Sequence, residues 1–199
     1  MGLDLETVDG QTPIDEDEKH DLLIRTISTR SELDEFEQKN IERAIEWTLR
    51  NNFKLERILT EQFVKEVHRQ MFNQVWKWAG EFRRSGKNIG IDWTQIPTSL
   101  NQLLGNCNFW IQNHTFPQDE IAIRFSHGLV QIYLFPNGNG RHSRLCGDIL
   151  VSKVFNRKVF TWGGNSELSP AGATRRKYIE AIRKADQGDY EDLLRFARS

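Results

Sequence analysis

Apolar residues recur at helical spacing through most of the chain. One series at helical spacing runs from Ser31 to Leu49, and a second series follows Thr60. Ser31, with Asp34 three residues later, predicts the N-terminal cap of the first helix. Thr60 predicts the cap of the second helix. The pattern therefore predicts two long helices before the middle of the chain.

Further apolar series predict helices in the second half. One follows Pro97 and another follows Pro117, since proline is tolerated in the first turn of a helix. The next runs from about Arg141 to Phe155, and Ser169-Pro170 predicts the cap of another. Asp189 predicts the start of a short terminal helix. No repeat or low-complexity segment interrupts this series.

The segment from Trp76 to Asp92 breaks the helical pattern. Gly80, Gly86 and Gly90 punctuate it, which favours a short, irregular β-hairpin. The predicted fold class is therefore mainly α, a helical bundle with one small β-hairpin. Residues 1–30 are polar and are predicted to form an N-terminal arm that packs partly through residues 22–24. Residues 31–199 are predicted to form one domain.

Composition narrows the function classes. Lys and Arg number 27 and Asp and Glu 28, so the formal net charge is −1 and no global attraction to nucleic acid or to an anionic membrane is expected. No apolar run is long enough to span a bilayer, and the acidic N-terminus lacks a secretory pattern. Two cysteines imply no disulfide framework. We expect a cytoplasmic protein with no nucleic-acid or membrane partner.

The chemistry concentrates in the loop Asn137-Gly138-Asn139-Gly140-Arg141, between two predicted helices. Glycine and asparagine adopt left-handed backbone conformations at low cost, so successive N–H groups can converge on one anion. The helix that follows adds free N–H groups and the positive end of its dipole. Arg141 and, one turn later, Arg144 add planar forks suited to phosphate. These residues predict a site for a nucleotide polyphosphate.

An ordinary turn is the alternative interpretation of this loop. Asn-Gly pairs also mark tight hairpins, and the preceding segment VQIYLF tolerates a β-strand. The following segment RHSRLCGDIL has no alternation of apolar and polar positions. This argues against a hairpin.

The segment YLFPNGNGRHSR resembles, without a gap, the signature of the Fic family, His-Pro-Phe-x-Asp/Glu-Gly-Asn-Gly-Arg-x-x-Arg. Two further segments support the resemblance. WKWAGEFRRSGKNIG is similar to the family's Trp-Ala-Gly-x-x-Arg segment with its target-positioning flap, here Lys87-Asn88-Ile89-Gly90, and KYIEAIRKADQGDYEDLLRF is similar to a Fic C-terminus. Across residues 30–197 the chain is most similar to the subgroup called mobile mystery protein B. The resemblance implies a Fic-type helical bundle.

The resemblance also implies an activity. In such proteins the histidine that opens the signature takes a proton from a target protein's hydroxyl, which attacks the α-phosphate of ATP and receives AMP. Tyr133 stands at this position here. A phenol has a pKa of roughly 10, so it is a poor base near neutral pH, and loss of a general base costs on the order of a hundredfold to ten-thousandfold in rate. Adenylyltransferase activity is therefore expected to be impaired or lost.

Two further departures from the signature affect the metal and the helix end. Asn137 replaces the usual carboxylate, so Mg²⁺ bound with ATP is expected to be held weakly at this residue. Leu134 replaces proline, and Pro136 is expected to take over the helix-ending role.

The remaining histidines and the family's inhibitory helix also bear on this activity. His142 is expected at the surface or in a cap, and His127 in the core with its polar atoms satisfied; His68 lies in an unrelated sequence context. Many Fic proteins carry an inhibitory helix whose glutamate pairs with the second arginine. No segment here fits that pattern in full; if autoinhibition exists, the candidate is the helix from Ser31, with Glu35 reaching Arg144.

The competing functions differ in class. The first is a nucleotide-binding Fic protein with weak transfer activity or none. The second is a non-catalytic Fic pseudoenzyme that binds a nucleotide or a protein partner, in a toxin–antitoxin or mobile-element setting. The third is a transferase that moves another phosphate-containing group. A DNA-binding role is disfavoured by the net charge of −1.

Overall fold

The computed structural model describes residues 19–164 and 173–199, and nearly all regular structure in them is helical. The helices are α2 (Arg30–Arg50), α3 (Leu55–Ile58), α4 (Glu61–Phe72), α5 (Ile96–Gln112), α6 (Gln118–Ile132), α7 (Asn139–Ile149), α8 (Ala173–Ala185) and α9 (Glu191–Arg198), with a 3₁₀ turn at Trp93–Gln95 and a π-helical segment at Leu150–Val154. The predicted mainly α class is confirmed.

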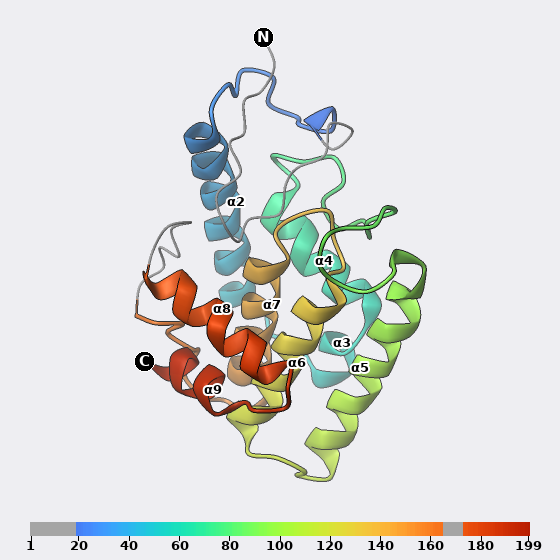
Figure 1. Cartoon of the computed structure of the whole chain (residues 1–199), viewed down its shortest axis with the longest axis vertical. Coiled ribbons are helices and arrows are strands. Elements are labelled where there is room, and N and C mark those ends of the chain that lie inside the picture. The colour runs from blue at the N-terminus through green and yellow to red at the C-terminus, as the bar shows by residue number, and fades with distance from the viewer. Residues whose placement is uncertain (1–18, 165–172) are drawn as a thin grey trace.

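The helices pack in pairs around a central pair, α6 and α7 (Figure 1). Helix α2 packs on α4, and α4 also contacts α7. Helix α5 runs along one side of the molecule against α6, while α8 and α9 pack together on another side. The loop between α6 and α7 therefore lies inside the bundle framework, with neighbours from the N-terminal helices.

Helix α2 begins two residues earlier than a cap at Ser31 predicts, and its cap differs. Thr29 is the N-cap, and its hydroxyl accepts a hydrogen bond from the Glu32 N–H at 3.3 Å, while the Glu32 carboxylate accepts one from the Thr29 N–H at 3.1 Å. The predicted Ser31–Asp34 box is wrong. A Glu at the third position reaches back to the cap N–H, which the shorter Asp34 side chain does less readily.

The other predicted helix starts mostly hold. Thr60 caps α4 by accepting from the Phe63 N–H at 3.1 Å, Pro97 lies in the first turn of α5, and Pro117 is the N-cap of α6. Helix α9 starts at Glu191, whose N–H donates to the Asp189 side chain at 3.0 Å. The predicted cap at Ser169-Pro170 lies outside the described residues. The short helix α3 was not predicted.

The predicted β-hairpin between Trp76 and Asp92 does not form. This segment contains no strand, and the isolated bridge in the described residues joins Leu22 to Trp76. The two halves of the segment from Trp76 to Asp92 form hydrogen bonds with the end of α6 and not with each other. The Arg83 N–H donates to the Leu134 carbonyl at 3.0 Å, and the Ile91 N–H donates to the Ile132 carbonyl at 3.5 Å. The backbone groups that a hairpin would pair are thus used elsewhere.

The described part of the predicted arm lies against this region. The Leu23 N–H donates to the Val75 carbonyl at 2.9 Å, and Leu22 and Ile24 pack on the core, whereas Leu23 is exposed. No helix in the described residues is both long and apolar enough to cross a membrane.

Candidate functional site

Helix α6 ends at Tyr133, which adopts the left-handed conformation with φ 59°. Its N–H donates to the Leu129 carbonyl at 3.2 Å, as in a left-handed helix cap, and its side chain is buried. Such a conformation is costly for an aromatic residue, so neighbouring contacts must hold it. The turn redirects the chain from α6 into the Asn137–Arg141 loop.

Arg83 supplies the main contact at this turn. Its side chain is 2% exposed, and its guanidinium donates to the carbonyls of Tyr133 at 2.6 Å and Ser85 at 2.9 Å, and also to those of Ile91 and Ile132. Arg83 therefore satisfies the terminal carbonyls of α6 and ties the segment 85–91 to them. In the sequence, Arg83 was recognised only as the arginine of the Trp-Ala-Gly-x-x-Arg segment, and its role at the end of α6 was not predicted.

The predicted flap lies directly over Tyr133. A Cβ atom on Gly90, whose φ is +90°, would come within 2.4 Å of the Tyr133 Cβ, so only glycine fits there. Ile89 is 51% exposed and Asn88 is exposed, while Lys87 is half-buried. Gly90 thus covers Tyr133, and Asn88 and Ile89 face outward.

The Asn137–Arg141 loop is braced from within by Asn139. The Phe135 N–H donates to the Asn139 Oδ1 at 2.9 Å, and the Asn139 Nδ2 donates to the Phe135 carbonyl at 2.8 Å. Gly138 has φ +77°, and a Cβ there would lie 2.5 Å from the Phe72 ring. The Asn139 side chain is therefore occupied in shaping the loop, and its backbone N–H belongs to the first turn of α7.

The first turn of α7 presents backbone N–H groups that could bind an anion. Residues 139–141 are its first three, so their N–H groups have no partner within the helix and point out from its N-terminus. A Cβ on Gly140 would meet no atom within 4 Å, which leaves open space over this turn. An anion placed there would meet backbone donors and the positive end of the α7 dipole.

His68 supports the loop, a role that sequence reasoning missed. Its ring is fully buried and stacks on Phe135 with 3.7 Å between ring centroids. The Gly80 N–H donates to Nδ1 at 2.9 Å, and Nε2 lies 3.1 Å from the Asn137 carbonyl. Burial holds the pKa of His68 well below its usual value, so the ring is neutral with its proton on Nε2. Its partners are distant in sequence, and no local pattern signals them.

Arg141 is engaged by a residue that was not predicted. Its Nη2 lies 2.7 Å from the Glu37 Oε2, forming an ion pair that lacks hydrogen-bond alignment, and its guanidinium lies 5.1 Å from the Phe72 ring centroid. Glu37 is 1% exposed and accepts from the Trp76 indole N–H at 2.7 Å through its other oxygen. Helix α2 thus brings a carboxylate to the loop.

The predicted pairing of Glu35 with Arg144 is wrong. Glu35 is exposed, because its neighbours Leu33 and Glu37 take the buried face of α2. Arg144 instead lies over the Tyr178 ring of α8, 5.1 Å from its centroid. Burial lowers the pKa of Arg144 from its ordinary, very high value. Arg141 and Arg144 lie one turn apart on α7, but they have different partners.

Neither His142 nor His127 takes the place of a base at position 133. His142 is buried, its Nε2 lies 3.0 Å from the Val64 carbonyl, and burial lowers its pKa to about 4. His127 is buried between Asp186, 2.8 Å from its Nε2, and Tyr190, 3.0 Å from its Nδ1. The core interpretation of His127 is confirmed, whereas His142 lies in the core and not at the surface.

The loop residues could hold a metal ion only together with a bound phosphate ligand. In residues 19–164 and 173–199, no group of three His, Cys, Asp or Glu side chains could hold a metal. The Asn137 Oδ1 accepts from the Gly138 N–H at 2.6 Å, so this one neutral oxygen is partly used. A Mg²⁺ ion here would be held mainly by phosphate oxygens.

Comparison with known proteins agrees with this geometry. Residues 58–151 match the model of the Fic/DOC family. A protein adenylyltransferase Fic of Aedes aegypti is 28% identical over 142 residues, which cover 69% of this chain but 27% of that protein. The chain therefore spans little more than a quarter of that relative's length.

Solved structures share the fold. The N-terminal Fic domain of Bep8 from Bartonella sp. 1-1C has a TM-score of 0.67 at 13% identity, covering 87% of this chain and 88% of that one. BepC from Bartonella tribocorum, solved with bound AMPPNP, has a TM-score of 0.64 at 17% identity, covering 92% and 97%. Residues 58–151 thus match a Fic/DOC family domain, on a fold that the described chain shares with solved Fic structures.

Proposed function

We propose that this chain is a Fic/DOC protein that binds ATP or a related nucleotide by its phosphates, and that its capacity to transfer AMP to protein hydroxyls is impaired or lost. The observation that carries the proposal is the turn at Gly138 into the open first turn of α7, next to Arg141. Adenylyltransferases among the relatives and a similar fold with bound AMPPNP support the nucleotide class.

Each part of the loop has a role in this proposal. The N–H groups of Asn139, Gly140 and Arg141 would donate to phosphate oxygens, while Asn137 and Gly138 shape the turn. The Arg141 guanidinium would add a fork, and Arg144 lies one turn further on. Mg²⁺ bound with the nucleotide would neutralise phosphate charge, with the Asn137 carbonyl as a weak protein ligand.

The missing element is a base. In AMP transfer, a hydroxyl oxygen bonds to the α-phosphorus, the bond to pyrophosphate breaks, and the hydroxyl proton must be taken up. Tyr133 has a phenol where that proton would go, and a phenol accepts it poorly near neutral pH. His68, His127 and His142 are each bound to other groups, so none replaces it.

Labelling with α-labelled ATP tests the transfer. The protein and Tyr133→His are incubated with Mg²⁺ or Mn²⁺ and a cell lysate, which supplies the unknown target hydroxyl. We expect labelling only with Tyr133→His, since histidine restores the base on an intact cradle. Equal labelling by both proteins would contradict the role assigned to Tyr133.

Calorimetric titration with ATP tests the phosphate cradle separately. Arg141→Ala should weaken binding by about tenfold or more, because it removes a charge-assisted fork. Arg50→Ala is the matched control, since Arg50 is exposed at the end of α2 and pairs there with Glu46. If ATP does not bind, or if both variants bind alike, the cradle proposal is wrong.

A non-catalytic binding module is the second candidate. The buried position of Tyr133 beneath Gly90 favours it, because this residue is covered where a catalytic group needs access. In that case ATP binds, and Tyr133→His labels nothing. Asn88 and Ile89, the exposed flap residues, would then be available to a protein partner. We also propose that the protein is cytoplasmic, that it has a paired regulator, and that it belongs to the mobile mystery protein B subgroup.

A further inference from the structure

Helix α5 lies in a long stretch without charged side chains. No Asp, Glu, Lys or Arg occurs from Trp93 to Gln118, although these residues make up 28% of the chain. Nevertheless, this helix lies along one side of the molecule (Figure 1), and several of its residues are exposed. An exposed helix face without charge is unusual, and depletion of charge with exposed aromatic residues is typical of protein interfaces.

The uncharged face has a protruding side chain near the C-terminal end of α5. Phe109 is 58% exposed, which is high for a phenylalanine. One turn before it lies Gly105, where an added Cβ would meet no atom within 4 Å. A large aromatic side chain and an open backbone therefore stand side by side on one helix face.

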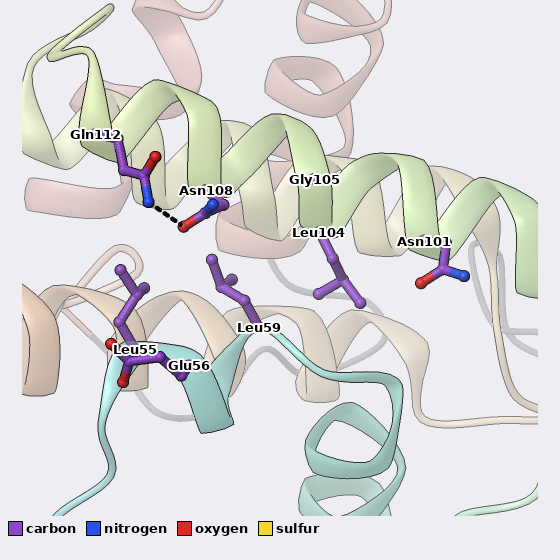
Figure 2. A pocket seen from close by; sticks show the side chains of 8 residues that line it. All are labelled: Leu55, Glu56, Leu59, Asn101, Leu104, Gly105, Asn108 and Gln112. Carbon is purple, nitrogen blue, oxygen red and sulfur yellow. Dashed lines mark hydrogen bonds between the residues drawn. The ribbon is translucent and has the colours of Figure 1, made fainter.

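A pocket opens beside Gly105, between α5 and α3. Its volume is about 440 Å³, and its lining combines leucines with amides: Leu55, Glu56, Leu59, Asn101, Leu104, Gly105, Asn108 and Gln112. Figure 2 shows Leu59 and Leu104 pointing into the gap from opposite sides, with the Asn108 and Gln112 amides, 3.4 Å apart, along its upper edge. This pocket contains none of the residues of the Asn137–Arg141 loop.

We propose that this face binds a second copy of the chain, with two α5 helices packed antiparallel about a two-fold axis. The Phe109 of each copy would fill the pocket beside the Gly105 of the other. Phe109 and one wall of the pocket lie on the same helix, so one two-fold rotation can satisfy both contacts, as an isologous interface requires.

The polar residues of the face fit the same partner. An amide carries both donors and an acceptor, so the side chains of Asn101, Asn108 and Gln112 can pair with their own kind across a two-fold axis. On α5 itself, the absence of charge removes repulsion between two identical helix faces; Glu56 of α3 is the charged residue among those that line the pocket. Gly105 allows close approach of the two backbones. These features favour a second copy over a different protein.

Sedimentation velocity across a range of protein concentrations tests this contact. We expect a monomer–dimer equilibrium that Phe109→Glu weakens by on the order of tenfold or more, because it removes the central aromatic anchor. Phe36→Glu is the matched control, since Phe36 is also exposed, at 39%, but lies on α2. The control should dimerise like the wild type.

A second pair of variants separates dimerisation from folding. Gly105→Lys fills the hole with a charged side chain, yet it should raise the melting temperature of the monomer, since glycine is a poor helix former and no neighbour is crowded. We expect loss of the dimer in Gly105→Lys and its retention in Gly105→Ala. A protein that stays monomeric at every concentration, or a dimer that Phe109→Glu and Gly105→Lys leave intact, overturns the proposal. Occupation of the face by a different protein, with no self-association, also overturns it.

Discussion

At the scale of single residues, the loop that follows α6 is built by buried polar side chains that satisfy backbone groups. The Asn139 side chain accepts from the Phe135 N–H, and the His68 ring bonds to the Asn137 carbonyl. The Arg83 guanidinium donates to the Tyr133 carbonyl at the end of α6. Each removes an unpaired backbone group that would otherwise cost about 1–3 kcal/mol when buried. The loop is therefore held in one shape before any ligand arrives.

The two glycines of the loop should respond oppositely to alanine. Gly138→Ala places a Cβ at φ +77° against the Phe72 ring, so we expect a loss of about 2 kcal/mol or more in unfolding free energy. Gly140→Ala meets no neighbour and should fold at least as stably, but its methyl group enters the space proposed for phosphate and should weaken ATP binding. Urea unfolding and calorimetry measure the two effects. A stable Gly138→Ala, or full ATP affinity in Gly140→Ala, would contradict these assignments.

Asp148 gives a pH-dependent prediction. Burial raises the pKa of this carboxyl to about 7, while the Trp162 indole and the Phe160 N–H donate to it and Arg144 and Arg198 lie near. A raised folded-state pKa means that the unfolded chain loses its proton first, so this group's contribution to stability declines as pH rises from about 4 to 7.

The isosteric variant Asp148→Asn isolates this effect. Between about pH 4 and 7, the unfolding free energy of the wild type should fall relative to that of the variant by up to about 1.4 kcal/mol per pH unit. Above about pH 7 the difference should stay constant. Urea unfolding of both proteins at several pH values measures the difference. Parallel curves would show that Asp148 does not titrate in this range.

At the scale of elements, helix starts were well predicted because their signals are local. Thr60, Pro97 and Pro117 each act within one turn of the helix that they begin. The segment 76–92 was mispredicted because its hydrogen bonds go to residues 132–134, some fifty positions away. A glycine-rich pattern predicts a turn but does not predict its partner.

Arg83 should control the order of this segment. In Arg83→Met the side chain keeps its length but donates no hydrogen bonds to the carbonyls of Ser85, Ile91 and Tyr133. We expect amide hydrogen exchange to rise by about tenfold or more in residues 84–91. Arg84→Met is the control, because Arg84 is exposed. Equal amide exchange in both variants would show that Arg83 does not order this segment.

At the scale of the whole molecule, the candidate site is assembled from distant parts of the chain. The sequence pattern predicted the loop and its two arginines, but not the carboxylate that α2 places against Arg141. Glu37 and Arg141 are about a hundred residues apart, and Glu37 had no motif to mark it. The packing of α2 on α4 brings them together, and sequence periodicity alone does not specify that packing.

Glu37 should compete with a bound phosphate. Both seek the Arg141 guanidinium, and two anions in one small volume repel each other. We therefore expect Glu37→Gln to bind ATP more tightly, by a few-fold to about tenfold, with the Trp76 indole still bonded to the amide oxygen. Calorimetry beside Glu35→Gln, an exposed neighbour, measures this. Weaker binding in Glu37→Gln would mean that the carboxylate positions Arg141 for the ligand.

The left-handed turn at Tyr133 also bears on how this chain can change over time. The turn is held by two hydrogen bonds of the Tyr133 backbone: its N–H donates to the Leu129 carbonyl, and its carbonyl accepts from the Arg83 guanidinium. Histidine tolerates this conformation better than tyrosine does. Tyrosine and histidine codons differ by one nucleotide. A single point mutation can therefore return the imidazole to a backbone that is already shaped to present it, and selection can gain or lose that group without rebuilding the fold.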